Sequence, residues 1–513
     1  MTAGTAQITQ RADDGDRKPA AATRVSGHGP DLAGRLRTTH EERPRLSFDL
    51  DVEVCVVGAG LAGLTVAREA ALLGMSVAVI ESRQVGWNAA GHNFGAVMPG
   101  FPVDVTDLIT RIGFEDAREL WGLAQDGADY VRSTVTDHAM AGVALSEGAL
   151  EVSSVDSGDQ LISRLQMLGE DFGTEVEGWQ VDRVRGVLRT PRYFHAVHYP
   201  KAFQIDGRHY IHGLAALAEQ AGARIFEETP AIGIDPAGIR KRIATPAARV
   251  RAAHIVLCGG VHLGAPLRRL ADTLLPVWRY AALSAPLGPR LAEVIAFAGA
   301  VADSDGLAQY RVVDGDRLLW CSGAGTLPIA PARFAHRAQR EIATLYPALG
   351  TVEIADVFGG VVGLTVHGMP QIGAMRRGVW VASGFGHQGL NTSAMAGQLI
   401  ARGIADGDDR WRLFSPFELV WAGGTGGRVV GQAIFSLSRG RAALAGALAR
   451  HRERSLQRAR QDEIRNAAVK RPRRPAAPTP PAVAAAASPK KITDIDPEQL
   501  PAAPNDRPSG PLA

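Results

Sequence analysis

Residues 52–81 read VEVCVVGAGLAGLTVAREAALLGMSVAVIE, and this stretch decides the fold. The apolar run at 52–57 is typical of a parallel strand that is covered on both faces. A helix of small residues is predicted from about residue 61 to 73, and Ser76–Ile80 forms a second apolar run. Strand, glycine turn, helix and strand in this order predict a doubly wound α/β unit around a parallel sheet.

Three glycines join the first predicted strand to the helix. Gly58, Gly60 and Gly63 have the spacing G-x-G-x-x-G. Gly58 suits a tight turn, Gly60 has no Cβ to obstruct a pyrophosphate, and Gly63 allows the helix to approach the strand. Unpaired N–H groups at the start of the helix favour a phosphate. The pattern therefore predicts a dinucleotide site.

A carboxylate ends the unit. Glu81 stands about 20 residues beyond the glycines, where an acidic side chain accepts hydrogen bonds from ribose hydroxyls. Because it would repel a 2′-phosphate, the ligand is expected to have a free ribose. The sequence indicates FAD or NAD rather than NADP.

Composition limits the class of protein. The chain has 513 residues, enough for two or three domains, and a net charge of +3. Residues 1–48 carry +2 and residues 450–513 carry +6, so residues 49–449 carry −5, which argues against a nucleic-acid groove. The three cysteines give no disulfide framework or metal spacing, and no apolar run suits a signal peptide or a membrane span. A cytoplasmic location is expected.

Residues 85–101, 368–373 and 383–401 resemble one known family. VGWNAAGHNFGAVMPGF is similar to its loop V-G-W-G-A-S-G-R-N-G-G-x-x-x-P-G-F, GMPQIG to its P-x-I-G turn, and SGFGHQGLNTSAMAGQLIA to the turn and helix that close its flavin site. With residues 52–81, these patches resemble FAD-dependent amine and amino-acid oxidoreductases of the D-amino-acid oxidase type over about residues 50–440. The chain looks most like gamma-glutamylputrescine oxidoreductase-like and glycine or sarcosine oxidase-like members.

The resemblance implies FAD and oxidation of a C–N bond by hydride transfer to flavin N5, with the imine hydrolysed to an aldehyde or keto acid. The expected partners are a small-molecule amine or amino acid and oxygen or another electron acceptor, without nucleic acid or a membrane span. Two other interpretations stay open, an NAD-dependent dehydrogenase and a non-catalytic flavin-binding protein.

The domain organisation follows from the alternation of helical and β-branched segments. An α/β fold, α+β overall, is expected, with a Rossmann-like FAD-binding domain made of discontinuous segments and a substrate domain built on an antiparallel sheet. The first domain is predicted to comprise residues 49–100, 206–261 and 376–449. The substrate or cap domain is predicted to comprise residues 101–205 and 262–375. Residues 1–48 are expected to be a disordered tail, and residues 450–513 a basic helix followed by a disordered Pro/Ala-rich tail.

The loop at 85–101 departs from the family pattern. His92 stands where relatives have Arg, and Asn88 stands where some relatives have the His of W-H-A-A-G that binds FAD covalently. His92 is left as the candidate for a tether. Because no Cys precedes GMPQIG either, non-covalent FAD is expected.

The predicted site residues fall into two groups. Four are predicted to act on the substrate, namely His367, Tyr310, Arg311 and Arg428, with Trp278, Tyr280 and Trp320 as candidates for the pocket wall. No metal site is predicted. The residues predicted to bind FAD are Gly58, Ala59, Gly60, Leu61, Ala62, Gly63, Glu81, Ser82, Arg83, Asn88, Ala89, Gly91, His92, Asn93, Ile232, Cys258, Gly259, Gly260, Gly384, Gly386, His387, Gln388, Gly389 and Leu390.

Overall fold

The computed structural model describes residues 42–156, 158–264, 267–303 and 308–437, together with Gly440 and Ser455. The chain divides into two units, residues 1–452 and 453–513, and the fold below is that of the first. The predicted C-terminal tail, apart from Ser455, and residues 1–41 of the predicted N-terminal tail lie outside the described residues.

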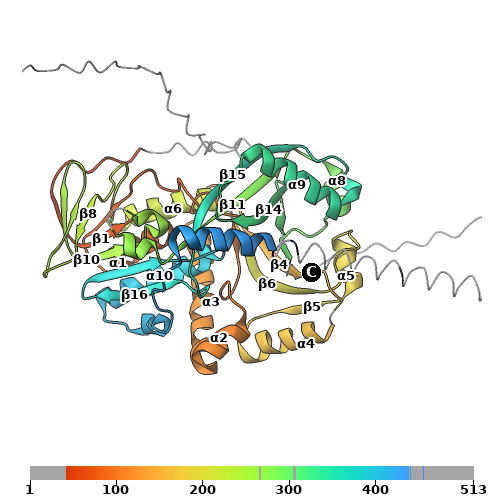
Figure 1. Cartoon of the computed structure of the whole chain (residues 1–513), viewed down its shortest axis with the longest axis horizontal. Coiled ribbons are helices and arrows are strands. Elements are labelled where there is room, and N and C mark those ends of the chain that lie inside the picture. The colour runs from red at the N-terminus through yellow and green to blue at the C-terminus, as the bar shows by residue number, and fades with distance from the viewer. Residues whose placement is uncertain are drawn as a thin grey trace, which may run out of the picture. The chain divides into compact units, whose positions relative to one another are not determined.

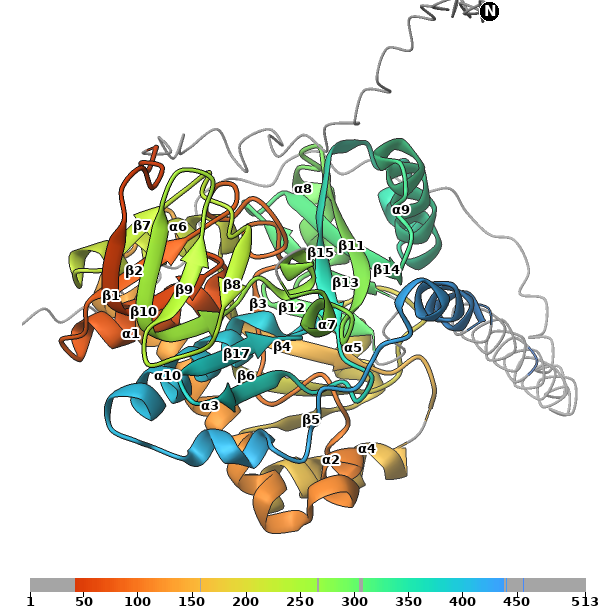
Figure 2. The same cartoon turned by 60° about the vertical axis from the view of Figure 1, so that its left-hand side comes forward.

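An eight-stranded sheet within the described residues contains the glycine motif (Figures 1 and 2). Its five parallel strands are, in spatial order, β17 (Val379–Ser383), β10 (Arg249–Leu257), β1 (Leu50–Val57), β2 (Val77–Ile80) and β7 (Arg224–Phe226). The antiparallel strands are β16 (Gln371–Arg376), beside β17, and β9 (Lys241–Ala244), beside the start of β10, with β8 (Gly233–Asp235) paired to β9. The predicted parallel sheet is confirmed.

Both faces of this sheet are covered, as the apolar run predicts. Val54 and Val56 pack into one core, whereas Cys55 and Val57 pack into the core on the opposite face. Each fully buried valine stabilises the fold by roughly 1.5–3 kcal/mol. The longest helices that contribute to the first core are α1 (Leu61–Leu72), α3 (Phe114–Asp137), α6 (Gly207–Gln220) and α10 (Gly389–Ala405).

A second sheet, of nine described strands, is almost entirely antiparallel. Its spatial order is β15 (Ile354–Leu364), β11 (Leu275–Ser284), β14 (Arg317–Gly325), β13 (Ala308–Val313), β12 (Ala300–Asp303), β4 (Ser146–Val152), β6 (Ala196–Gln204) and β3 (Ala96–Val97), with β5 (Glu177–Trp179) beside β6. Only β12 and β4 pair in parallel among these strands. The predicted antiparallel sheet is confirmed by the antiparallel pairs of β11 with β14 and β14 with β13.

The two faces of this second sheet have different environments. Tyr280 and Trp320 lie in a core with residues of α8 (Pro289–Val294) and α9 (Pro331–Leu345). Their neighbours Ala281 and Cys321 point the other way and pack with Phe94. Because side chains alternate along a strand, helices cover one face, and the other is left for the loop that follows β2.

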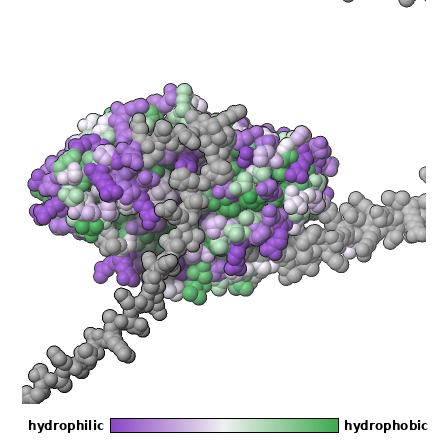
Figure 3. Space-filling view, turned by 90° about the horizontal axis from the view of Figure 1, so that it is seen from above, coloured by the Kyte–Doolittle hydropathy of each residue, from purple (hydrophilic) through white to green (hydrophobic). Residues whose placement is uncertain are grey.

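Shorter elements complete the described part of the chain. They are α2 (Val105–Ile112), α4 (Gly158–Gln166), the π-helical turn η1 (Met167–Asp171), α5 (Val181–Val187), the 3₁₀ turns η2 (Gly260–Leu263), η3 (Pro347–Leu349) and η4 (Arg410–Phe414), α7 (Arg268–Ala271) and a helical stretch over residues 424–437. No helix within the described ranges is long and apolar enough to cross a bilayer. On the face shown in Figure 3, hydrophilic residues alternate with small groups of hydrophobic ones.

The predicted domain boundaries stay a prediction, and three elements bear on them. β3 lies in the segment assigned to the cofactor domain but pairs with β6 of the antiparallel sheet. β16 begins inside the segment assigned to the cap but pairs with β17 of the parallel sheet. α3, also assigned to the cap, packs on α10, since a Cβ at Gly127 would lie 2.3 Å from the carbonyl oxygen of Asn391.

Residues 42–48 are folded, which corrects the predicted start of the folded body. Arg43 donates two hydrogen bonds to Glu219, at 2.8 and 2.9 Å. Leu46 is only 2% exposed, and its N–H donates to Thr229 Oγ1. The stretch is too short and too polar for its periodicity to reveal these contacts.

Candidate functional site

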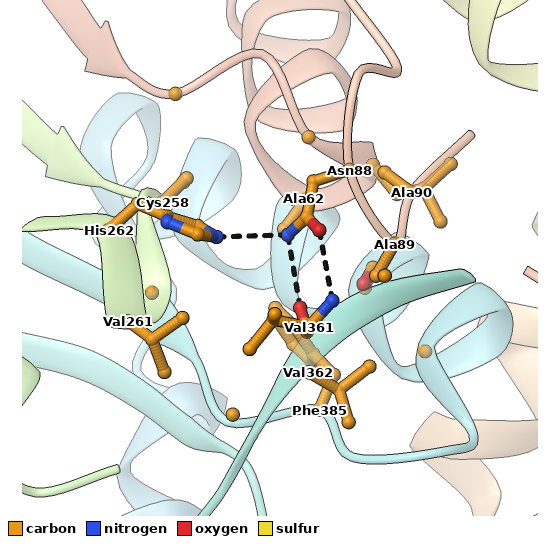
Figure 4. A pocket seen from close by; sticks show the side chains of 18 of the residues that line it. Ala62, Asn88, Ala89, Ala90, Cys258, Val261, His262, Val361, Val362 and Phe385 are labelled. Carbon is orange, nitrogen blue, oxygen red and sulfur yellow. Dashed lines mark hydrogen bonds between the residues drawn. The ribbon is translucent and has the colours of Figure 1, made fainter. Parts of the chain in front are cut away.

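A cavity of about 560 Å³ lies between the two sheets. Its walls come from the glycine turn after β1, the loop 86–96, the turn η2, strands β11 and β15, and the turn that precedes α10. Figure 4 shows part of this wall, with Asn88 and Val361 facing each other. The volume lies within the usual range for a ligand pocket, roughly 300–1,000 Å³.

The glycine turn has the geometry that a diphosphate requires. Gly58 has φ +106°, and a Cβ there would meet the backbone of Gly259 at 3.0 Å. A Cβ at Gly63 would lie 2.1 Å from the carbonyl oxygen of Gly58. At Gly60, by contrast, a Cβ would meet nothing within 4 Å and the residue lines the cavity. The N-terminus of α1 therefore faces open space that accommodates phosphates.

Glu81 is held with one oxygen available for a ribose. Its Oε2 accepts the N–H of Ala59 at 2.8 Å. Its Oε1 accepts from Ser82 Oγ, Arg83 N and Trp87 Nε1, each at 3.0 Å. Since three donors occupy Oε1 and only one occupies Oε2, Oε2 has the remaining capacity to accept a hydroxyl. The side chain is buried and lines the cavity.

Asn88 joins the loop 86–96 to strand β15. Its Oδ1 accepts from Val361 N at 2.9 Å, and its Nδ2 donates to Val361 O at 3.0 Å (Figure 4). This pair fixes the amide orientation, so the contact from Nδ2 to His262 Nε2 at 3.0 Å makes that nitrogen an acceptor. Burial and the charge of Arg83 lower the pKa of His262, in agreement with a neutral ring.

The turn before α10 presents a second set of backbone N–H groups to the cavity. Gly384 and Gly386 have φ values of +74° and +61°. Gly389 and Leu390 begin α10 and line the cavity. His387 lies between these residues, and burial, together with the charge of Arg279, lowers its pKa to about 4. The imidazole is therefore neutral at physiological pH.

The part of the cavity next to β11 carries an arginine. Arg279 Nη2 has weak neutral partners, Gln309 Oε1 at 3.4 Å and Cys321 Sγ at 3.5 Å. Arg279, Cys321 and His92 all line the cavity. His92 Nδ1 donates to Asn88 O at 3.0 Å, and burial lowers its pKa, so Nε2 of the neutral ring carries a lone pair.

Twenty of the 24 residues predicted to bind FAD line this cavity. Gly63 and Gly91 do not, because they lie behind it, where a Cβ at Gly91 would meet Gly86 O at 2.2 Å. Arg83 stacks on Trp87 at 4.6 Å instead, and Gln388 is likewise absent from the lining. Sequence reasoning missed Trp87, His262, Val361 and Arg279. The available signal for Arg279 was its place in a strand between aromatic residues, Trp278 and Tyr280.

Tyr310 and Arg311, predicted to act on the substrate, do not line the cavity. Tyr310 lies in the core under α9, where its hydroxyl is 2.6 Å from that of Tyr346, which corrects its assignment to the substrate site. Arg311 points to the other face but donates to Ile205 O at 3.2 Å, and burial lowers its pKa to about 10. Of the three aromatic candidates, Tyr280 lines the cavity, whereas Trp278 and Trp320 do not.

His367 and Arg428 also lie outside the cavity lining. His367 fastens a turn, because its Nε2 donates to Glu418 O at 3.2 Å and its Nδ1 accepts from Met369 N. Arg428 donates to Thr326 O at 3.3 Å and holds the helical stretch 424–437 against the end of β14. Both have structural partners, which corrects their assignment to catalysis.

No group of three or more His, Cys, Asp or Glu side chains within the described residues is arranged to hold a metal ion. Cys55, Cys258 and Cys321 are free thiols. The cavity therefore offers glycine turns, helix N-termini and a ribose acceptor, which together fit an adenine dinucleotide.

Residues 53–402 match the family FAD dependent oxidoreductase, abbreviated DAO, and the chain belongs to this family. The protein is an FAD-dependent oxidoreductase, which decides between the two dinucleotides and sets aside the NAD-dependent alternative. The residues that line the cavity fit this cofactor at both glycine turns.

Curated relatives cover most of the chain. OrdL of Haemophilus influenzae, named a probable oxidoreductase, is 23% identical over 402 residues, covering 75% of this chain and 90% of that protein. Gamma-glutamylputrescine oxidoreductase of Escherichia coli is 24% identical over 377 residues, covering 72% and 87%.

Solved structures share the fold. Glycine oxidase from Geobacillus kaustophilus superposes with a TM-score of 0.59 at 20% identity, covering 72% of this chain and 99% of that chain. L-proline dehydrogenase from P. horikoshii superposes with a TM-score of 0.61 at 17% identity, covering 72% and 100%.

Proposed function

We propose that this oxidoreductase oxidises a C–N bond of a small amine or amino acid by transfer of a hydride from carbon to flavin N5. The imine then hydrolyses to an aldehyde or keto acid. The observation that carries the proposal is that one cavity extends from the phosphate turn at Gly60 to Arg279 and Cys321 on the antiparallel sheet. A substrate at the second end would lie beside the ring of the dinucleotide held at the first.

The named activities of relatives support an amine substrate. Gamma-glutamylputrescine, glycine and L-proline each contain an amine nitrogen next to an oxidisable carbon, and proteins named for these substrates share the sequence or the fold. The chemical environment of the cavity agrees, because three neutral histidines and one arginine line it.

Arg279 is our candidate for binding a substrate carboxylate. Its guanidinium forms only weak neutral contacts, and no ion pair involving it occurs within the described residues. A guanidinium in a partly buried wall gains most from a carboxylate, which accepts two parallel N–H bonds. Arg279 replaces Arg311 and Arg428 in this role.

His92 is our candidate for accepting a proton from the substrate amine. The amine must be neutral when hydride leaves the adjacent carbon, because the nitrogen lone pair forms the C=N bond of the product and in a protonated amine that pair is bonded to hydrogen. The Nδ1–H of His92 is committed to Asn88 O, so Nε2 is left as an acceptor. We also propose that FAD binds non-covalently, since Asn88 stands where some relatives have the His that binds FAD covalently and no Cys precedes GMPQIG.

The test is anaerobic bleaching of the flavin by a panel of amines and amino acids. For an amino acid that bleaches the wild type, the concentration that bleaches half of the flavin should be about 10- to 100-fold higher with Arg279→Met, because charge-assisted hydrogen bonds to the substrate carboxylate are lost. Arg340→Met, in an exposed position on α9, is the matched control and should behave as the wild type.

The outcomes separate the claims. Flavin that no amine or amino acid bleaches would refute the proposed reaction and favour a non-catalytic flavoprotein. If Arg279→Met is bleached as readily as the wild type, Arg279 does not bind the substrate carboxylate, but the proposed reaction stands. Reoxidation on admitting air distinguishes oxygen from another electron acceptor, and flavin released by acid would establish non-covalent binding.

A further inference from the structure

His262 lies at the edge where the parallel strands end. It belongs to the turn η2, which follows β10 along the chain. Gly259, which precedes this turn, packs against the phosphate turn, since a Cβ on Gly58 would lie 3.0 Å from Gly259 N. Ligands of open α/β sheets bind beyond the carboxyl ends of the parallel strands. His262 is an exposed residue there and lines the cavity.

The orientation of the Asn88 amide determines which nitrogen of His262 carries hydrogen. Val361 N donates to Asn88 Oδ1 at 2.9 Å, and Asn88 Nδ2 donates to Val361 O at 3.0 Å. A reversed amide would set donor against donor and acceptor against acceptor, so the backbone of Val361 fixes the amide. Asn88 Nδ2 therefore donates its second hydrogen to His262 Nε2, at 3.0 Å (Figure 4). Since Nε2 accepts, the hydrogen of the neutral ring is on Nδ1.

The Nδ1–H of His262 has no acceptor within the described residues, where the contact with Asn88 is the one hydrogen bond that this side chain makes. The ring is nevertheless held in place from a second side. The rings of His262 and Trp87 meet edge to face, with centroids 4.9 Å apart. Trp87 in turn donates to Glu81, the ribose acceptor. His262 therefore presents a positioned donor to the cavity.

The cofactor supplies oxygen acceptors in this part of the site. The glycine turn beside His262 faces space that accommodates a diphosphate, and Glu81 has an oxygen available for the ribose of the adenosine. In FAD the diphosphate continues into the ribityl chain, so phosphate oxygens and ribityl hydroxyls follow along the molecule. A bound dinucleotide displaces water from the cavity, and an N–H group that is then left without an acceptor lowers the affinity.

We propose that His262 is a cofactor-binding residue, which donates its Nδ1–H to an oxygen of the diphosphate or the ribityl chain of FAD. Asn88 is the positioning residue for this contact, because it occupies Nε2 and so sets the tautomer. Strand β15 of the antiparallel sheet thereby controls, through one amide, a donor that follows the parallel sheet. The inference rests on the cofactor of the family and does not depend on the proposed substrate or reaction.

Two substitutions separate the roles of the two ring nitrogens. The side-chain amide of asparagine reaches the position of Nδ1, and that of glutamine reaches the position of Nε2. His262→Asn therefore keeps a donor toward the cavity and loses the contact with Asn88, whereas His262→Gln does the reverse. The flavin-free full chain is titrated with FAD, and quenching of the flavin fluorescence gives the Kd. The Kd should be about tenfold higher for His262→Gln and within about twofold of the wild type for His262→Asn.

His336→Gln, the same change at an exposed position on α9, is the matched control and should keep the Kd of the wild type. If His262→Gln binds ADP as well as FAD more weakly, the acceptor is on the diphosphate, and if it binds FAD alone more weakly, the acceptor is on the ribityl chain. Equal Kd values for the wild type and His262→Gln would overturn the proposal. So would equally weak binding of FAD by His262→Asn and His262→Gln, because the contact with Asn88 would then matter rather than the donor on Nδ1.

A second measurement identifies the tautomer in the flavin-loaded full chain and does not require removal of the flavin. In a nuclear magnetic resonance spectrum of protein with isotope-labelled histidine, the resonances that disappear in His262→Gln belong to His262. Their nitrogen shifts should show hydrogen on Nδ1 and a lone pair on Nε2. Hydrogen on Nε2 in the flavin-loaded protein would overturn the proposal.

Discussion

At Gly60 the absence of a side chain keeps the phosphate end of the cavity open. A Cβ there points into space that no atom fills within 4 Å, so Gly60→Val is tolerated by the protein but not by a diphosphate. We expect at least about tenfold less flavin per polypeptide, with melting of the flavin-free protein unchanged. Gly122→Val, at another glycine whose Cβ position is open, should retain full flavin. Full flavin content in Gly60→Val would show that the dinucleotide lies elsewhere.

His387 makes stability depend on pH in a defined direction. Its pKa is about 4 in the folded protein, against an ordinary value of 6.5. Between these values the unfolded chain binds a proton that the folded chain does not, so the free energy of unfolding falls as the pH falls from 6.5 to 4. Because the His387 side chain is exposed to the open cavity, solvent screening reduces this effect below what the full shift in pKa implies. His387→Asn should flatten this dependence.

The measurement is urea unfolding of the wild type and His387→Asn at several pH values in that window. His336→Asn, at an exposed position on α9, is the control and should keep the slope of the wild type. A slope that His387→Asn leaves unchanged would assign the pH dependence to other histidines that line the cavity, such as His92 or His262, whose pKa values desolvation also lowers.

At the scale of elements, Asn88 takes the place of a neighbouring strand. β15 ends the described antiparallel sheet, so its outer edge has no strand partner there. Asn88 pairs with both the N–H and the C=O of Val361 on that edge. Gly360 permits the approach, because a Cβ there would lie 2.5 Å from the backbone nitrogen of Ala89. The cavity wall therefore depends on one side-chain amide.

Asn88→Leu removes both hydrogen bonds while keeping the volume. Two backbone groups of Val361 lose their partners, at about 1–3 kcal/mol each when they are buried. We expect a lower melting temperature and weaker flavin retention together, measured by calorimetry and by flavin release on dilution. Gln339→Leu, which breaks one hydrogen bond to Val352 O far from the cavity, should lower stability without changing flavin release. If Asn88→Leu changes stability alone, the contact does not shape the cofactor site.

At the scale of the whole molecule, periodicity and motif spacing predicted the elements formed by neighbouring residues but not the contacts between distant segments. The unit around Gly58, Gly60 and Glu81 follows from periodicity and spacing within 30 residues, and the structure has it in the predicted form. The orientation of the antiparallel sheet could not be read in this way. Tyr310 and Arg311 alternate, but only the position of α9 decides which of them faces a core. Arg279 enters the cavity because β11 lies beside β15, a pairing across about 80 residues of sequence that no local pattern predicts.

The N-terminal boundary gives the last test, because composition and structure disagree there. A disordered stretch 1–48 would tolerate any change, whereas the structure buries Leu46 in the core behind the parallel sheet. Leu46→Ala should cost about 2–5 kcal/mol, the usual range for a buried leucine. Leu73→Ala, at a position 46% exposed, should cost under about 0.5 kcal/mol. Denaturant unfolding measures both losses of stability. Equal losses for Leu46→Ala and Leu73→Ala would show that residues 42–48 do not belong to the folded body. Deletion of residues 1–47 should destabilise the protein more than Leu46→Ala does, because it also removes the hydrogen bonds from Arg43 to Glu219.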